Sequence, residues 1–282
     1  MRSGRGRAVD LHQLQPARRR CDLRGDPGAL PGDRAVSGGA YARYLAVVQA
    51  QLACAGTDRV AAAVAAAAEL IVEQVLAGRV LYAFGASHAG LLVQDQFYRA
   101  GGLVPIWPIL PASLMLNVEP VTATSTLEQT PGAAAEILAD VPLGAGDLLL
   151  IVSVSGRNPV TVEMCTLAQQ RGATVIALTN VTYSSAVDGR SGPRLFEVAD
   201  VVLDLPGVVG DATVVLRDDL PPVGPTSSAV GAAMLHGLMV EVSARLTERG
   251  ATPPVFASAN LDDSTAWNAR WIAAYRDRVT YL

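Results

Sequence analysis

The chain has 282 residues, of which half are hydrophobic and 17% are charged, so it can bury a large core. It contains no lysine, which excludes Schiff-base chemistry, an anchor for pyridoxal phosphate and the P-loop lysine. The three cysteines are too few and too scattered for a disulfide framework or a zinc knuckle, so we expect a reduced, cytoplasmic protein with no metal and no cofactor.

The first 34 residues differ from the rest, because they contain eight arginines and four aspartates. They lack the apolar stretch of a signal peptide, and their prolines and glycines predict a disordered tail over residues 1–36. The remainder is acidic, which disfavours binding to nucleic acid. It contains no run of 18 apolar residues, so we expect no contact with a membrane.

Residues 37–282 are expected to form one domain. Apolar residues recur at helical spacing from 41 to 52 and from 57 to 75, which predicts two helices within 37–78. The α/β core, 79–250, contains apolar runs that alternate with helical patterns, and 251–282 form a C-terminal extension. The apolar runs lie at 79–84, 103–109, 147–152, 174–179 and 200–205, and the helices are expected at 88–100, 127–140, 159–171 and about 226–249.

Uniformly apolar strands that alternate with helices indicate a parallel sheet covered on both faces. We therefore predict an α/β fold with a doubly wound parallel sheet, preceded by a helical segment. In such sheets, ligands bind at the carboxyl ends of the strands, where the helices begin.

Polar residues follow directly after the run at 147–152. Ser153 and Ser155 come first, and then Asn158 is placed to cap the next helix and Pro159 to occupy its first turn. The free N–H groups and the positive end of the helix dipole then face the same space as the serine hydroxyls. This arrangement predicts a site for an anion.

The same feature recurs at two other helix starts. Ser87 and His88 follow the first strand within GASHAG (85–90), and hydroxyl residues precede the last helix within GPTSS (224–228). Each hydroxyl alone is consistent with an ordinary helix cap. Taken together along a doubly wound sheet, they predict convergence on one phosphate group.

GASHAG, SVSGRN (153–158) and GPTSS in front of a long helix resemble the SIS (sugar isomerase) domain. FYRAGGLVP (97–105), LE (127–128), GPTSS and PPVFASAN (253–260) resemble more closely a bacterial family of single-domain SIS proteins, and the sedoheptulose-7-phosphate isomerases are more distant. The resemblance covers about residue 40 to the last residue. It implies a five-stranded parallel sheet, phosphosugar binding, and a homodimer or homotetramer with sites near subunit contacts.

The resemblance also assigns residues to phosphate binding in three loops. They are Ser87 in the first loop, Ser153, Ser155 and Asn158 in the second, and Thr226, Ser227 and Ser228 in the third. This chain departs from the close relatives in the first loop, where they have Gly-Thr-Gly-His-Ser-His, and at Gln94 and Asp95, where they have paired glutamates. Near the end, a family histidine is replaced by Trp267, which is followed by the retained Asn268.

Isomerisation of a sugar phosphate needs a base and an acid. His236 is either a core histidine or a catalytic group, and its position resembles that of the catalytic histidine in SIS heptose-phosphate isomerases. Asp95 lies where those enzymes place a catalytic glutamate, and Glu128 matches a glutamate of the close relatives. The alternatives are a surface carboxylate for Asp95 and a helix N-terminal acid for Glu128. His88 and Arg157 are candidate substrate contacts, with a helix cap and a solvated loop residue as alternatives.

Three functions fit these residues. The first, which we favour, is an aldose–ketose isomerase that uses His236 with Asp95 or Glu128. The second is a phosphosugar sensor without chemistry, which the reduced first loop favours, and the third is a lyase or deaminase acting on amino-sugar phosphates. A dinucleotide site and a serine-hydrolase elbow are disfavoured, because Ser87 replaces the middle glycine of the former and Ala89 the second glycine of the latter.

Overall fold

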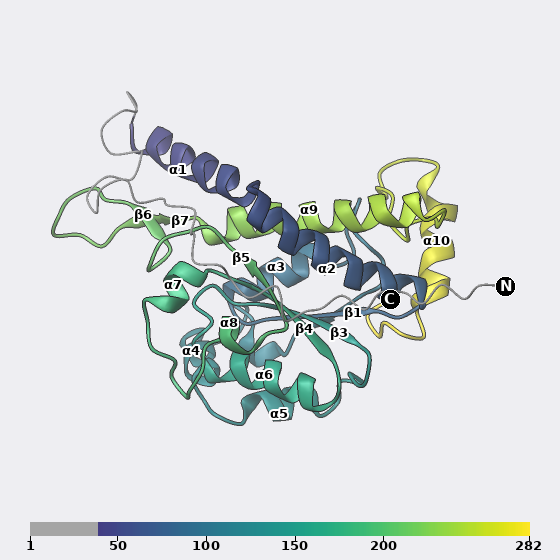
Figure 1. Ribbon diagram of the computed structural model, residues 1–282, viewed down its shortest axis with the longest axis horizontal. Helices are drawn as coiled ribbons and strands as arrows, with labels where there is room; N and C mark the ends of the chain where they lie inside the picture. Colours follow the sequence, from purple (N-terminus) through teal and green to yellow (C-terminus); the bar gives the residue numbers. More distant parts are fainter. Residues whose placement is uncertain (1–38) are drawn as a thin grey trace.

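The computed structural model describes residues 39–282, so the tail predicted over residues 1–36 lies outside the described part (Figure 1). Helices α1 and α2 precede a sheet of strands β1 to β5, and a short hairpin, β6–β7, leads into the long helix α9. The elements are α1 (Ala40–Ala55), α2 (Asp58–Leu76), β1 (Leu81–Gly85), α3 (His88–Gln96), β2 (Ile106–Ile109), the short 3-10 helix η2 (Ala112–Leu114), α4 (Thr122–Glu128), α5 (Ala133–Leu138), β3 (Leu148–Val152), α6 (Pro159–Gln170), β4 (Thr174–Thr179), α7 (Val181–Ser185), α8 (Leu195–Val198), β5 (Val201–Asp204), β6 (Ala212–Val214), β7 (Val223–Pro225), α9 (Ser227–Glu248) and α10 (Ser264–Tyr275).

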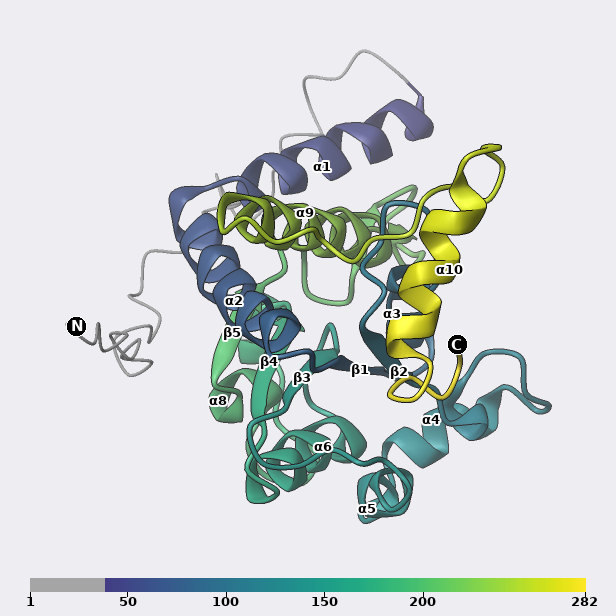
Figure 2. The same ribbon diagram turned by 90° about the vertical axis from the view of Figure 1, so that its right-hand side faces the viewer.

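The five main strands form one parallel sheet in the order β2-β1-β3-β4-β5, which confirms the predicted fold class. Helices α2, α3 and α9 cover one face of the sheet, and α5 and α6 cover the other (Figure 2). Leu148 and Leu150 point into the first layer, whereas Leu149 and Ile151 point into the second. Most strand residues are apolar because helices cover both faces of the sheet, and Thr174, Thr179 and Asp204 are polar residues at strand ends.

The strand order places a topological switch point between β1 and β3. From β1 the chain continues to β2 on one side, and it then crosses to β3 on the other side. The two strands are in register from Leu81 opposite Leu148 to Gly85 opposite Val152, so they end at the same edge. A crevice outside the carboxyl ends of two such strands is where open α/β sheets bind ligands.

Two features differ from the expected helices. The helix predicted over 127–140 is two helices, α4 and α5, because Pro131 and Gly132 interrupt it and Gly132 has a φ of 88°. The helix predicted over 88–100 ends at Gln96. The sequence pattern also missed the β6–β7 hairpin and α10 (Figure 1).

The two motifs at 97–105 and 253–260 lie against each other. Leu103 and Val255 form an antiparallel bridge. The N–H of Gly101 donates to the carbonyl of Phe256 at 2.8 Å, and the N–H of Phe256 donates to the carbonyl of Gly102 at 3.0 Å. The side chain of Asn268 bonds to both backbone groups of Ala257, at 2.8 and 3.0 Å, which gives that residue a structural role.

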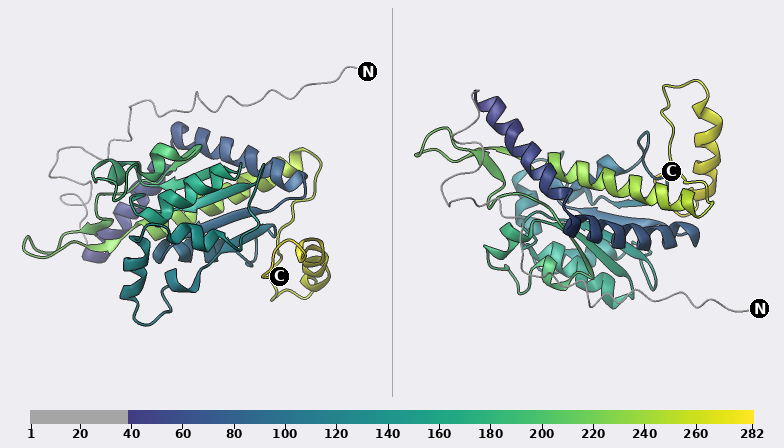
Figure 3. Two further views of the ribbon diagram at one scale, coloured as in Figure 1. Left: turned by 90° about the horizontal axis from the view of Figure 1, so that it is seen from below. Right: turned by 45° about the horizontal axis from the view of Figure 1, so that its top comes forward.

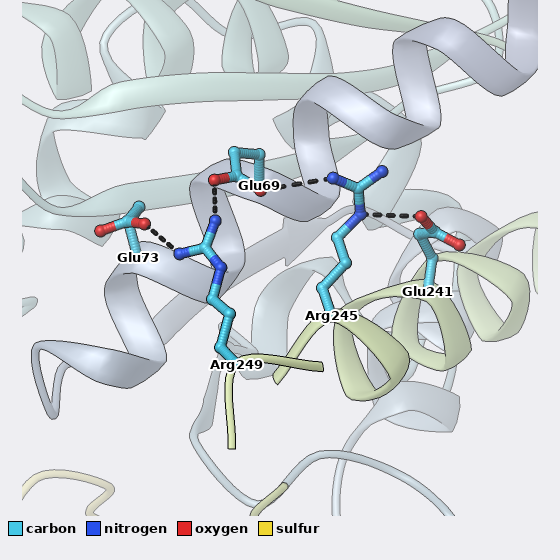
Figure 4. A network of polar contacts seen from close by, with 5 residues as sticks. All are labelled: Glu69, Glu73, Glu241, Arg245 and Arg249. Carbon is cyan, nitrogen blue, oxygen red and sulfur yellow. Dashed lines mark hydrogen bonds and ion pairs between the residues drawn. The ribbon is translucent and has the colours of Figure 1, made fainter. Parts of the chain in front are cut away.

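Within the described residues, α9 is the one helix long and apolar enough to cross a membrane, with a mean hydropathy of 1.2. However, 44% of that apolar window is buried inside the protein, where α9 packs lengthwise beside α2 (Figure 3). Arg245 and Arg249 near its end pair with Glu69 of α2, and Glu241 pairs with Arg245 (Figure 4). These contacts attach α9 to α2, as in a core helix, and give Glu241 a structural role.

Candidate active site

Ser87 occupies a strained turn between β1 and α3. It is the residue before α3, with φ of 51° and ψ of −122°, a conformation that favours glycine. Gly85 makes the tight turn possible, because an added Cβ would lie 2.6 Å from the backbone of Ala89. Ser87 therefore keeps a hydroxyl where the backbone disfavours any side chain.

Glu128 joins the loops that follow β1 and β3. The Ser87 hydroxyl donates to Glu128 Oε1, and Asn158 Nδ2 donates to Glu128 Oε2 at 2.7 Å. Asn158 precedes α6 as predicted, but its side chain does not cap the helix, because it is turned towards Glu128. Glu128 is the last residue of α4, so it is not the helix N-terminal acid that the alternative interpretation required.

The loop from Ser153 to Asn158 offers unused hydrogen-bond donors. The backbone N–H groups of residues 155–158 and the half-buried hydroxyls of Ser153 and Ser155 make no hydrogen bond within residues 39–282. Gly156 turns the loop with a φ of 57°, and the buried Nε of Arg157 has no partner in the same part of the chain. Successive free N–H groups of this kind form a concave site for an anion.

The third loop is arranged differently from the expectation. Asp211 accepts hydrogen bonds from the N–H groups of Thr226 and Ser227, at 3.1 and 2.9 Å, and from the Ser227 hydroxyl at 2.6 Å. The Thr226 hydroxyl is buried and has no partner among residues 39–282, and Ser228 is exposed. The chain's own carboxylate thus occupies the start of α9, so these donors are not free for a phosphate.

Asp95 and His236 lie together between α3 and α9. Asp95 Oδ2 is 2.8 Å from His236 Nε2, and Arg99 forms an ion pair with Asp95 while lying 3.2 Å from the same ring nitrogen. The amide nitrogen of Gln96 lies 3.3 Å from His236 Nδ1. His236 is 38% exposed and is therefore not a core histidine.

These contacts define how the imidazole is held. Gln96 lies against Nδ1 of the ring, and Asp95 and Arg99 lie against Nε2, so residues of α3 hold the imidazole at both of its nitrogens. Sequence reasoning did not find Gln96 or Arg99. A signal existed for Arg99, because it lies four residues after Asp95 and therefore on the same side of a helix.

The packing of α3 on α9 fixes where the Asp95–His236 pair lies relative to Ser87 and Glu128. An added Cβ on Gly231 would be 3.0 Å from Leu92, so the helices approach closely there. The contact of Asp95 with His236 lies further along both helices than the contact of Leu92 with Gly231. The helices α3 and α9 therefore run parallel and start at the same edge. Asp95 is eight residues beyond Ser87, which places the Asp95–His236 pair about 12 Å along α3 from the first loop.

The remaining candidates stay peripheral. His88 is exposed at the start of α3, and it makes no side-chain hydrogen bond within the described chain. No group of three or more His, Cys, Asp or Glu side chains suited to a metal ion lies among residues 39–282.

Comparison with known proteins identifies the family. The SIS domain matches residues 43–180. A UPF0309 protein of Shouchella clausii is 46% identical over 218 residues, which make up 77% of this chain and 89% of the relative. This chain belongs to the UPF0309 family. A second UPF0309 protein, from Streptomyces coelicolor, is 40% identical over 227 residues, or 79% of this chain and 90% of the relative.

The resemblance of the UPF0309 chain to SIS domains is thereby confirmed. Among solved structures, a phosphoheptose isomerase of Francisella tularensis is similar, with 17% identity and a TM-score of 0.45. The similarity covers 69% of this chain and 90% of that one.

Proposed function

We propose that the protein binds a sugar phosphate between the loops after β1 and β3 and interconverts its aldose and ketose forms. The observation that carries the proposal is the set of free N–H groups over residues 155–158 at the switch point of the sheet. Membership of a SIS domain family supports a phosphosugar ligand. Ser153, Ser155 and the start of α6 would hold the phosphate without any lysine.

The spacing of the two clusters sets a requirement on the substrate. With its phosphate beside Ser87, in the loop after β1, a substrate has to extend about 12 Å along α3 to reach the pair of Asp95 and His236. An open-chain sugar phosphate with several carbons between its phosphate and its carbonyl fits this span, whereas a triose phosphate is too short. We therefore expect activity on hexose or longer phosphates and none on triose phosphates.

The Asp95–His236 pair supplies the acid and the base. The base removes the proton on C2 of the aldose, the C–H electrons form the C1=C2 bond of an enediol, and the acid protonates O1. Loss of the O2 proton and return of a proton to C1 then give the ketose. The guanidinium of Arg99, next to both residues, is placed to stabilise negative charge on the oxygens.

Glu128 is the rival base, and its contacts argue for a different task. It lies among the donors proposed for phosphate, bonded to Ser87 and Asn158, whereas Asp95 contacts the histidine directly. We therefore assign the acid–base step to Asp95 and His236.

The test uses NMR in heavy water with a panel of aldose, ketose and amino-sugar phosphates. We expect exchange of the C2 proton, which His236→Ala and Asp95→Asn abolish and the exposed control Asp140→Asn retains. Exchange that survives in both site variants would refute the assignment.

A non-catalytic sensor remains the second candidate, because Asp95 and His236 bond to each other and leave no gap between them. Tight binding of a sugar phosphate without proton exchange would support it. Elimination or release of ammonia from an amino-sugar phosphate would instead support the lyase or deaminase.

We also propose a cytoplasmic homodimer or homotetramer that binds neither nucleic acid nor membrane. Two exposed apolar side chains support self-association, since Tyr41 on α1 is 75% exposed and Val240 on α9 is 68% exposed. Light scattering after size-exclusion chromatography measures the mass, and a monomer would contradict the proposal.

A further inference from the structure

Glu128 puts a negative charge at the place where an anion is expected. Both of its carboxylate oxygens are engaged, one by the Ser87 hydroxyl and one by the amide of Asn158. Asn158 also supplies one of the free backbone N–H groups of the anion loop. Any phosphate held by that loop therefore lies beside the carboxylate.

The charges around the loop do not balance for a free phosphate ion. Arg157 is the one cation within residues 153–158, so the loop itself contributes a single positive charge. A phosphate dianion adds two negative charges, and like charges a few ångströms apart repel strongly in a half-buried site. The helix starts offer only partial positive charge. Inorganic phosphate therefore binds at a disadvantage.

A phosphate ester that carries hydroxyl groups meets a different environment. An ionised carboxylate only accepts hydrogen bonds, and it has room for more than the two it receives here. Hydroxyls on the carbons next to the phosphate can donate to Glu128, either in addition to Ser87 and Asn158 or in their place. These hydrogen bonds offset part of the electrostatic repulsion. Inorganic phosphate can offer Glu128 only its own P–OH proton, whereas a sugar phosphate offers several hydroxyl groups.

We propose that Glu128 is a specificity-determining residue that makes this site select polyhydroxylated phosphate esters over inorganic phosphate. The inference rests on the proposed function, because it assumes that the loop after β3 binds phosphate. It assigns Glu128 a role in recognition, which neither the sequence motif nor the family provides.

The test compares two ligands by isothermal titration calorimetry, potassium phosphate and sorbitol 6-phosphate, which cannot isomerise. The wild-type protein should prefer sorbitol 6-phosphate. In Glu128→Gln, which keeps the shape and removes the charge, phosphate should bind about tenfold more tightly, and the preference should shrink. The control Glu136→Gln makes the same charge change at an exposed position of α5 and should behave as wild type.

The outcomes separate the two proposals. If Glu128→Gln binds phosphate no more tightly than wild type while sorbitol 6-phosphate still binds, the role of Glu128 is wrong and the proposed function stands. If neither ligand binds to either protein, the phosphate site itself is wrong. Thermal denaturation checks folding, and Glu128→Ala gives the same readout should the glutamine variant be unfolded. Ser153→Ala with Ser155→Ala in the Glu128→Gln protein should remove the gained affinity.

Discussion

Substitutions of Ser87 measure the strain in the turn after β1. Both Ser87→Ala and Ser87→Gly remove the hydroxyl that donates to Glu128, which costs about 1–3 kcal/mol because a half-buried carboxylate loses a donor. They differ in the backbone, because alanine at a φ of 51° keeps the steric penalty of about 1–2 kcal/mol and glycine does not. Glycine has more conformational freedom in the unfolded chain, which lowers the stability of the glycine variant by about 0.5–1 kcal/mol.

The expected result is that Ser87→Gly is more stable than Ser87→Ala by up to about 1 kcal/mol. Guanidinium chloride denaturation of both variants gives the free energies of unfolding. Ala62→Gly, at an exposed position inside α2, should show the opposite preference, with alanine more stable by about 1 kcal/mol. A glycine variant at position 87 that is less stable than the alanine variant would refute the reasoning about strain.

Three further results follow from the packing. Burial and, to a smaller extent, the charge of Asp200 raise the pKa of the Cys165 thiol from 9.0 to about 12. The contribution of the thiol to stability is therefore full below pH 9 and is lost as the pH rises towards 12. In Cys165→Ala the free energy of unfolding, measured in urea, should depend less on pH over this alkaline range. Glu69→Gln should lower the melting temperature in dilute buffer but not in 1 M salt, because the Glu69 carboxylate of α2 forms ion pairs with Arg245 and Arg249, which salt screens. An equal loss in both buffers would contradict a stabilisation by ion pairs. Gly231→Val should destabilise the protein by about 1–3 kcal/mol, because a side chain does not fit against α3. Gly237→Ala, on the open side of α9, should stabilise the protein by about 1 kcal/mol. Equal effects of the two substitutions would contradict the packing described for α9.

Most of the sheet was predictable from the sequence because each strand is buried on both faces. All five apolar runs became parallel strands, and Pro159 and Gly172 mark the ends of α6 as expected. The prediction failed where helical periodicity continued across a breaker, at Pro131 and Gly132. It also missed β6 and β7, because three-residue strands carry too short a pattern to recognise.

The candidate site was predictable only in part, for a related reason. Local signals placed Ser87 and Asn158 at helix starts, and both are there. However, a helix-start residue reveals nothing about a distant carboxylate that competes for its side chain, as Glu128 does. The contact of Asp211 with Ser227 depends on how the hairpin packs, and the contact of Arg99 with His236 depends on how α3 packs on α9. A single sequence records neither packing.

The bridge between Leu103 and Val255 has a consequence for biosynthesis. The segment just after Arg99 is held by backbone bonds to residues near 255, which the ribosome adds long after the sheet strands have emerged. A nascent chain can therefore assemble β1 to β5 while the turn beside Asp95 still lacks its anchor. We therefore expect the pair of Asp95 and His236 to become fully ordered late in synthesis, after the segment that leads to α10 has docked.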